Sequence, residues 1–350
     1  MNERIKKLKE KIKEHELSGI IVSNPINIRY LTGLTAEGTL IIGRYENNFI
    51  TDSRYIEEVM NIIKVEDELI VQNLKNLKDE DYEHIFLRDS HVGFEENYIT
   101  YAGYKELKAK YKVDLVETES MIESLRSVKD EDEIECIKKA CEITDNAFNY
   151  IVNNLKFGMT EKQLANKIER YMISEGADGV AFETIVASGE NSSKPHSEPT
   201  DRVIKQGDIV LIDMGAKYHG YCSDMSRTVF VGSCKYEKEY NFVLDQQKKI
   251  TSSFKAGSNI KTVIDLAEKD YEVDGYEIMH AFGHNLGLEV HEEPALRNKE
   301  DSYLEKNMVI AVEPGVYDIG NYGIRIEDTY LVTNTGVEQL TKSDKSIIVV

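Results

Sequence analysis

The sequence predicts an N-terminal α/β domain over residues 1–124, followed by an α+β domain over residues 125–350. Short apolar runs alternate with helical patterns in the first part, which is typical of a sheet covered by helices. Near Ser124–Asp130 (SLRSVKD) the pattern changes to long helices, and two helices then precede strands in two successive rounds. The length of 350 residues agrees with about two domains.

The first domain opens with an amphipathic helix. Residues 3–16 place Ile5, Leu8 and Ile12 at spacings of three and four among lysines and glutamates. The predicted strands that follow are 19–23, 39–43, 48–51, 68–72 and 85–88, and the predicted helices are 53–62 and 99–111. We find no residue pattern in this domain that predicts chemistry.

The second domain begins with two helical patterns. One carries an apolar stripe from Ile134 to Ile151, and the next opens at a capping box of Thr160 and Gln163. A loop rich in turn-forming residues follows at 187–201 and contains His196. The later predicted elements are a strand hairpin at 208–231, helices at 236–255 and 260–270, and strands at 308–312 and 322–333.

The chain is strongly acidic, with a formal net charge of -20. Nucleic-acid binding needs clustered Lys and Arg, so we expect no nucleic-acid partner. The four cysteines form neither a CxxC pair nor a zinc spacing, which favours thiols in a reducing cytoplasm. No run approaches the roughly 18 apolar residues of a membrane span, and the N-terminus lacks an apolar signal region. We therefore expect a cytoplasmic protein with no membrane partner.

The hairpin at 208–231 (DIVLIDMGAKYHGYCSDMSRTVFV) places carboxylates on strands that its composition predicts to be buried. The apolar run 209–212 ends at Asp213, glycines mark the turn, and the second strand carries Asp224. A buried carboxylate is costly unless its charge is compensated, and two of them across one hairpin repel each other. A bound cation is the simplest compensation.

A later strand pair repeats this arrangement. The segment MVIAVEPG ends an apolar strand at Glu313, and the Pro and Gly that follow break it. The segment GIRIEDTYLV alternates, so Arg325 and Glu327 share one face while Ile324 and Ile326 share the other. We expect Glu313 and Glu327 to be presented much as the first hairpin presents its two aspartates.

Three histidines lie between the strand pairs, in HAFGHNLGLEVHEEP: His280, His284 and His291. A helical zinc pair of His280 and His284 is one interpretation, but two nearby glycines and the lack of an HExxH pattern weigh against it. His284 and His291 have opposite parity on a straight strand, so both reach one site only across a bend. Periodicity alone does not choose the histidine ligand. A lone Asp or His is usually an ordinary turn or core residue, so the combination carries the prediction.

The ordered segments IDMGA, CSDMSRT, FGHNLGLEVHEE, VEPGVY and GIRIED resemble the pita-bread metallopeptidases, the prolidase and aminopeptidase P group. NPINIRYLTG and TDSRY resemble that family's N-terminal domain, and FETIVASGENSSKPH (182–196) resembles its substrate loop. The resemblance covers nearly the whole chain. It implies a creatinase-like α/β N-terminal domain followed by a pita-bread α+β catalytic domain.

The resemblance also implies a site. It implies two divalent metal ions held by Asp213, Asp224, His284, Glu313 and Glu327. It further implies substrate or transition-state roles for His196, His280 and His291, with a supporting role for Arg325. Asn285 follows the expected histidine ligand where many relatives have glycine, a departure that removes no ligand.

The chemistry of these residues agrees with the resemblance. Four carboxylates and one imidazole form an oxygen-rich donor set, which favours Mn²⁺, with Co²⁺ or Zn²⁺ as alternatives. Two metals can make a hydroxide nucleophile from one water near neutral pH. We expect this nucleophile to attack the carbonyl before proline, with Glu313 shuttling the proton, His291 stabilising the oxyanion and His196 holding the substrate.

Several alternatives share this fold. A creatinase-like hydrolase would lack the metal ligands, and a non-catalytic peptide-binding module would have lost some of them. A methionine aminopeptidase would share the catalytic domain, but the long N-terminal domain favours the Xaa-Pro group. The sequence does not separate a dipeptidase from an aminopeptidase that acts on longer peptides, although the compact length leans toward prolidase. The family implies a homodimer.

Overall fold

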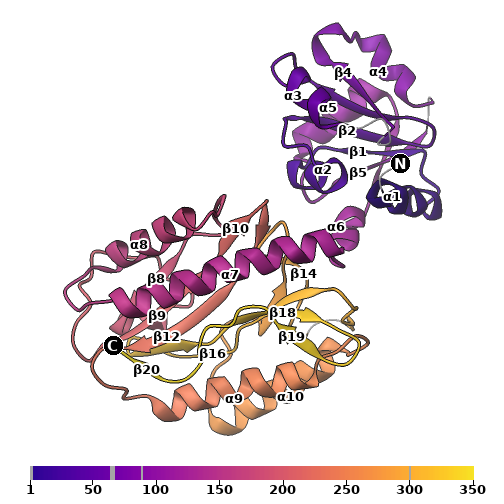
Figure 1. Cartoon of the computed structure of the whole chain (residues 1–350). Coiled ribbons are helices and arrows are strands. Elements are labelled where there is room, and N and C mark those ends of the chain that lie inside the picture. Colours follow the sequence, from indigo (N-terminus) through magenta and orange to yellow (C-terminus); the bar gives the residue numbers. More distant parts are fainter. Residues whose placement is uncertain (1–2, 64–67, 88–89, 299–300) are drawn as a thin grey trace. The chain divides into compact units, whose positions relative to one another are not determined.

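The computed structural model describes residues 3–63, 68–87, 90–298 and 301–350. The chain divides into two compact units, Met1–Arg126 and Ser127–Val350 (Figure 1). None of the helices in the described residues is both long and apolar enough to cross a membrane.

Unit 1 is an α/β fold built on a six-stranded sheet in the order β4-β3-β2-β1-β5-β6. β2 pairs antiparallel with β1 and β3, whereas β3–β4, β1–β5 and β5–β6 are parallel pairs. The strands are β1 Gly19–Val22, β2 Gly38–Gly43, β3 Asn47–Thr51, β4 Leu69–Asn73, β5 His91–Phe94 and β6 Asp114–Glu117. The helices are α1 Glu3–Glu14, α2 Pro25–Thr32, α3 Ile56–Ile62, α4 Asp79–Ile85, α5 Tyr101–Tyr111 and α6 Met121–Arg126.

The amphipathic helix predicted at residues 3–16 is confirmed as α1, which buries its three predicted apolar residues. The strand predicted at 85–88 is wrong, because Ile85 is the last residue of α4 and the strand in this region is β5. Arg88 of that prediction lies outside the described residues. The acidic residues before the predicted strand form the first turn of α4, where Asp81 accepts a hydrogen bond from the backbone N–H of Lys78 at 2.7 Å. This helix ends at Ile85, within the segment that was predicted as a strand.

Unit 2 holds its strands between two layers of helices, α7 and α8 on one side and α9 and α10 on the other (Figure 1). The helices are α7 Glu131–Asn154, α8 Glu161–Ser174, α9 Glu237–Ser253 and α10 Ile260–Asp274. The strands of the first half are β7 Gly179–Val180, β8 Ile185–Ser188, β9 Ile209–Met214, β10 Ala216–Tyr218, β11 Tyr221–Cys222 and β12 Met225–Phe230. Those of the second half are β13 Gly283–Asn285, β14 Glu292–Ala295, β15 Val309–Val312, β16 Gly315–Asp318, β17 Tyr322–Arg325, β18 Asp328–Val332, β19 Val337–Gln339 and β20 Ile348–Val349.

Two antiparallel strand pairs, β9–β12 and β15–β18, form the centre of unit 2. Ile212 of β9 packs with α7 and α8 in one hydrophobic core, and Val312 of β15 packs with α9 and α10 in another. Side chains alternate along a strand, so the residues next to these two point away from the helices. Those residues are Asp213 and Glu313, which therefore face the space between the strand pairs.

The structure differs from the predicted strands in two places. β10 and β11 lie within the hairpin predicted at 208–231 and join β7 in a separate sheet. The strand predicted at 322–333 is divided, because β17 pairs with β16 whereas β18 pairs with β15. The change of partner occurs at Ile326 and Glu327, so Glu327 lies between two strands that pair with different partners.

Candidate metal centre

One pocket of about 270 Å³ in unit 2 brings together all nine predicted site residues. They are Asp213, Asp224, His284, Glu313, Glu327, His196, His280, His291 and Arg325. Its lining also includes Phe182, Glu183, Ile185 and Val290, which we had not predicted individually. The first three belong to the segment 182–196, so the resemblance to a substrate loop was the signal available for them.

The four acids predicted as ligands lie where strands end or begin. Asp213 is the next-to-last residue of β9, and Asp224 immediately precedes β12. Glu313 immediately follows β15, and Glu327 immediately precedes β18. Each acid is adjacent in sequence to an apolar residue that packs toward the helices of its own strand pair, so the four carboxylates converge between the pairs.

His284 reaches the acids from β13, which pairs with β15. Gly283, just before it, has a φ of 149°, and a Cβ there would collide with the carbonyl oxygen of Ala311 on β15. Glycine therefore allows the close approach of the two strands that carries the imidazole into the pocket.

The imidazole of His284 is oriented for coordination. Its Nε2 lies 3.5 Å from Asp224 Oδ2 and 3.7 Å from Glu313 Oε1. Its Nδ1 lies 3.1 Å from the carbonyl oxygen of Asn285. A proton on Nδ1 satisfies that carbonyl and leaves the Nε2 lone pair for a metal ion.

Three buried acids of the pocket each have one oxygen without a hydrogen-bond donor: Asp213 Oδ1, Asp224 Oδ1 and Glu327 Oε1. Ligand atoms of Asp224, His284 and Glu327 lie within 4.8 Å of one another. A buried oxygen without a partner costs free energy, and hard divalent cations are bound by such carboxylate oxygens. The residues present therefore fit a divalent metal.

The pKa values of three of the pocket's carboxyl groups and of His284 show that the charged forms of these groups are disfavoured. Burial, followed by repulsion from the neighbouring carboxylates, raises the pKa values of Asp224 and Glu327 well above the usual range. Burial also raises the pKa of Glu313 to about 8 and lowers the pKa of His284 to about 4. A divalent cation favours the carboxylate and neutral imidazole forms, so it would relieve this conflict.

Arg325 is a cation that the protein itself supplies to the pocket. Its Nη2 donates to Asp213 Oδ2 at 2.7 Å, its Nε to Ser226 Oγ at 2.8 Å and its Nη1 to Tyr317 Oη at 2.7 Å. Ser226 in turn donates to Glu327 Oε2 at 2.8 Å. The sequence did not lead us to Ser226 or Tyr317, although the two-residue step from Asp224 could have placed Ser226 on the same face.

His280 is held in its neutral form. Its Nε2 accepts from Tyr317 Oη at 2.8 Å, and its Nδ1 donates to the carbonyl oxygen of Ala281 at 2.7 Å. Arg325 already donates to the Tyr317 oxygen, so the phenol proton is available to His280. Burial lowers the pKa of His280 to about 4, in agreement with this arrangement.

His196 and His291 are the exposed histidines of the pocket. The ring of His291 lies edge-on to that of His284, with a centroid separation of 4.4 Å. Histidines that are both exposed and part of the lining are accessible to a ligand that enters from solvent.

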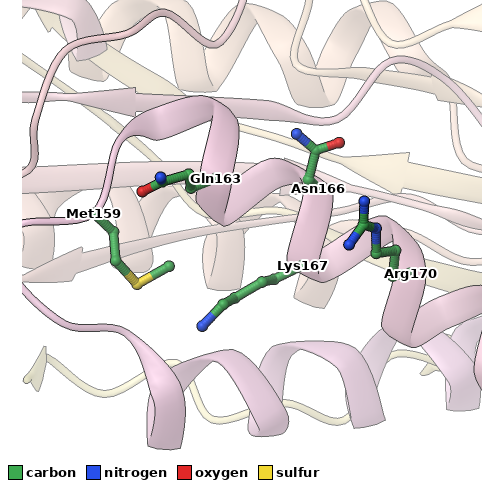
Figure 2. Close-up of a pocket in the computed structure, with 5 residues that line it drawn as sticks. All are labelled: Met159, Gln163, Asn166, Lys167 and Arg170. Atoms are coloured by element: carbon green, nitrogen blue, oxygen red, sulfur yellow. The ribbon is translucent and has the colours of Figure 1, made fainter.

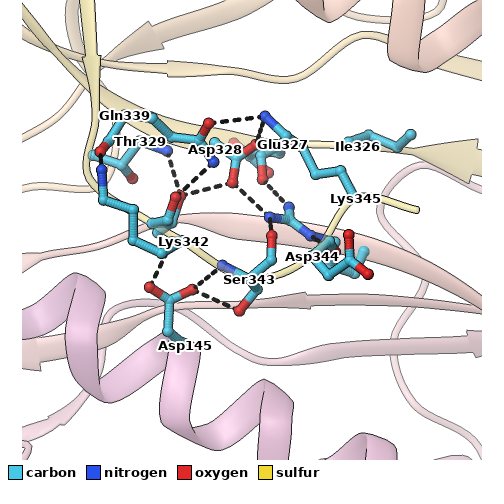
Figure 3. Close-up of polar contacts among 12 residues, drawn as sticks. Asp145, Ile326, Glu327, Asp328, Thr329, Gln339, Lys342, Ser343, Asp344 and Lys345 are labelled. Carbon is cyan, nitrogen blue, oxygen red and sulfur yellow. Dashed lines mark hydrogen bonds and ion pairs between the residues drawn. The ribbon is translucent and has the colours of Figure 1, made fainter. Parts of the chain in front are cut away.

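A buried network fixes the backbone behind Glu327 (Figure 3). Arg227 donates from Nη1 to the carbonyl oxygen of Glu327 and from Nη2 to Asp328 Oδ1, both at 2.6 Å. Asp328 also accepts from Thr341 Oγ1 at 2.8 Å, and Lys345 Nζ lies 2.9 Å from its other oxygen. Both Asp328 oxygens have partners, in contrast to Asp213, Asp224 and Glu327, so this network is a support for Glu327.

A pocket of about 470 Å³ beside α8 has a different character (Figure 2). It is lined by Met159, Gln163, Asn166, Lys167 and Arg170. These five described residues include no carboxylate and no imidazole, so they do not form a site for a hard cation.

The fold and the donor set define a two-domain metallopeptidase. Residues 135–334 match metallopeptidase family M24, and residues 4–128 match the creatinase/prolidase N-terminal domain. The chain belongs to metallopeptidase family M24. It therefore combines a creatinase-type N-terminal domain with a pita-bread catalytic domain, and membership of this family implies the use of a divalent metal.

Three relatives illustrate the similarity. The Xaa-Pro dipeptidase of Pyrococcus furiosus is 34% identical, with 99% of this chain and 100% of that protein covered. The structure of the Xaa-Pro dipeptidase from Bacillus anthracis has a TM-score of 0.93 at 35% identity, with 99% of each chain covered. That of the X-Pro aminopeptidase from Thermotoga maritima MSB8 has a TM-score of 0.89 at 33% identity, again over 99% of each chain.

Proposed function

We propose that this chain hydrolyses the Xaa-Pro bond of dipeptides or of peptides that begin with Xaa-Pro, with two divalent metal ions, Mn²⁺ by preference. The observation that carries the proposal is the set of three buried carboxylate oxygens without donors, grouped with His284 in one pocket. The Xaa-Pro specificity is supported by the Xaa-Pro peptidases to which almost the whole chain is similar.

The metal would be held by Asp213, Asp224, His284, Glu313 and Glu327. The four carboxylates of this set, together with Glu183 in the pocket lining, outnumber the single guanidinium of Arg325, and two dications balance this excess of negative charge better than one. Oxygen-rich donor sets suit Mn²⁺ better than thiolate sites do, so Mn²⁺ is the first metal to test.

The chemistry supplied by bound divalent metal is a lowered pKa for a water molecule and polarisation of the substrate carbonyl. The residues of the chain perform the remaining work. Glu313 accepts the proton of the attacking water and passes it to the departing proline nitrogen. His291 donates a hydrogen bond to the oxyanion, and His196 binds the substrate from the exposed side of the pocket.

Arg325 and His280 complete the proposed site. Arg325 holds Asp213 and, through Ser226, Glu327, so it keeps two proposed ligands in place. His280 is kept neutral by Tyr317 and can contact substrate without adding a charge. Proline presents a tertiary amide without an N–H, which a dedicated pocket can distinguish from other peptide bonds.

The proposal is tested with the full-length protein and a set of matched peptides. Ala-Pro is compared with Ala-Pro-led tripeptides, with longer peptides and with Met-Ala, each in Mn²⁺, Co²⁺ and Zn²⁺. We expect hydrolysis of Xaa-Pro substrates alone, with dipeptides favoured. Preferential release of methionine from Met-Ala would move the chain to a methionine aminopeptidase activity, and no hydrolysis with any metal would favour a binding module.

The homodimer and the cytoplasmic location stay predictions. The mass of the native protein in solution would test the dimer.

A further inference from the structure

Asn285 follows His284 directly, but it does not share the pocket. The side chain of His284 lines the pocket, whereas Asn285 is fully buried behind it. Adjacent residues on a strand point to opposite sides, so Asn285 extends from β13 away from the proposed metal. Its role must therefore be sought in what it contacts on that side.

The amide of Asn285 uses its entire hydrogen-bonding capacity. Its Nδ2 donates to the carbonyl oxygens of Ser127 at 3.1 Å and Glu293 at 3.0 Å. Its Oδ1 accepts from Lys129 Nζ at 2.9 Å and from the backbone N–H of Leu286 at 3.1 Å. Two donors and two acceptor positions are the full capacity of an asparagine side chain, so the amide can take only one orientation here.

Lys129 connects this amide to a carboxylate on the neighbouring strand. The lysine side chain is 1% exposed, and its Nζ lies 3.1 Å from Glu292 Oε2 and 3.0 Å from the carbonyl oxygen of Ser127. A buried ammonium is tolerated when it is paired and hydrogen-bonded, as it is here. Lys129 therefore joins the segment that precedes α7 to both β13 and β14.

A histidine of the pocket lies on or directly before each of the two strands held in this way. Asn285 follows His284 on β13, and Glu292 follows His291 at the start of β14. The pairing of the two strands is irregular at this point, since Asn285 pairs with Glu292 whereas His284 pairs with Ala295. An irregular ladder leaves backbone groups unpaired, and Asn285 Nδ2 binds one of them, the carbonyl oxygen of Glu293.

We propose that Asn285, through its bonds to Lys129, Ser127 and the bulge in β14, is a positioning residue that sets the approach of His284 to the metal and the place of His291 in the pocket. The proposal rests on the proposed function for the identity of the site. Residues that hold metal ligands from behind typically change metal affinity or activity 10- to 100-fold when they are replaced.

The first test measures Mn²⁺ affinity in the full-length protein after chelation, by calorimetry. Asn285→Ala removes all four hydrogen bonds. Asn285→Asp keeps the size of the side chain but puts an acceptor oxygen in place of the two N–H donors. We expect both variants to bind Mn²⁺ at least about 10-fold more weakly than the wild type. The Asp variant decides the matter if the Ala variant does not fold.

Asn27→Ala is the matched control. Asn27 is also fully buried and hydrogen-bonded through its amide, but it lies in unit 1 and contacts Glu95 and Glu123. We expect this variant to lose stability without a change in Mn²⁺ affinity. If Asn27→Ala lost Mn²⁺ affinity to the same extent, the loss in the Asn285 variants would be explained by general destabilisation. That result would overturn the positioning role of Asn285.

The second test follows hydrogen exchange of residues 284–293 in the metal-free wild type and in Asn285→Asp. We expect faster exchange in this segment of the variant and no change in α9. Unchanged exchange together with unchanged Mn²⁺ affinity overturns the inference. A wild type that binds no Mn²⁺ overturns the proposed function instead, and the exchange measurement still decides whether Asn285 orders the segment.

Discussion

Glu95 in unit 1 and Glu327 in unit 2 are both buried glutamates, but their surroundings differ. Glu95 accepts from the backbone N–H groups of Ser23 at 2.6 Å and Asn24 at 2.8 Å and from Asn27 Nδ2 at 2.7 Å. Glu327 accepts from Ser226 on one oxygen, and its other oxygen has no donor. Burial is the leading cause of a raised pKa for both carboxyl groups.

Burial alone therefore does not identify a carboxylate of this protein as a metal ligand. Glu161 and Asp328 are completely buried in unit 2, and donors satisfy both oxygens of each. Among the buried carboxylates of the described residues, the ones with an oxygen lacking a donor are Asp213, Asp224 and Glu327, and all three line one pocket. The missing donor separates three of the four proposed carboxylate ligands from the structural acids, and the fourth, Glu313, is only partly buried.

The largest expected effect is on activity. Glu327→Gln should lower kcat/KM for an Xaa-Pro dipeptide by about 10³-fold, because metal ions supply several kcal/mol of transition-state stabilisation and each 1.36 kcal/mol is tenfold. Glu95→Gln should leave kcat/KM within a few-fold of the wild type. Steady-state kinetics in excess Mn²⁺ check both variants. A similar loss of kcat/KM in both folded variants would contradict the distinction between the two glutamates.

The next effect is the stabilisation that metal provides. Chelation should lower the melting temperature of the wild type, and Mn²⁺ at a hundredfold excess over its Kd should restore about 2.7 kcal/mol. Glu95→Gln should retain this increment, and Glu327→Gln should lose most of it. Thermal unfolding with and without chelator measures the increment, which would be the same in the two variants if Glu327 were not a ligand.

The sequence was sufficient to predict the four acids of the site but not the contacts that hold them. Asp213 and Glu313 were predictable because an apolar run ends at each of them, and Glu327 was predictable because it alternates with apolar residues in GIRIED. The strand break before Glu327 was not predictable, because it depends on β17 and β18 pairing with different strands. Ser226 contacts Glu327 across 101 residues of chain, and such a contact exists only in the folded structure. The orientation of Asn285 depends in the same way on Lys129, 156 residues earlier.

A third prediction concerns the stability of the metal-free protein, where the two glutamates should respond in opposite directions. Glu95→Gln should lower the free energy of unfolding by about 1–3 kcal/mol, because an amide N–H₂ would face groups that are themselves donors. Glu327→Gln should raise it, because it removes a carboxyl group whose charged form is disfavoured by burial and then by Glu313 and Asp213. Urea denaturation at pH 8 in chelator measures both changes. A loss of stability in Glu327→Gln would count against an unsatisfied cluster.

The smallest effect is a pH dependence of the metal-free protein. The pKa of Glu313 is about 8 in the folded chain against 4.5 ordinarily, so the folded state binds more protons and its stability falls as pH rises toward 8. The lowered pKa values of His280 and His284, about 4, act in the opposite direction but only below 6.5. Stability should therefore fall between pH 6.5 and 8.

Urea denaturation across this pH interval provides the measurement, with Glu313→Gln as the comparison. The variant should show a shallower decline, because its side chain has no proton to lose. Saturating Mn²⁺ should remove the decline in the wild type, since metal-bound carboxylates are already ionised. A wild-type stability that rises from pH 6.5 to 8 without metal would contradict the assignment of raised carboxyl pKa values.

The most direct test of the central claim is a crystal structure of the full-length protein with Mn²⁺, with anomalous scattering used to locate the metal. The account predicts two anomalous peaks per chain in the pocket of unit 2, bound by Asp213, Asp224, His284, Glu313 and Glu327. It further predicts that Asp213 Oδ1, Asp224 Oδ1 and Glu327 Oε1, the oxygens that lack donors, are among the ligand atoms. Anomalous peaks elsewhere, or three oxygens that still have no partner, would contradict it.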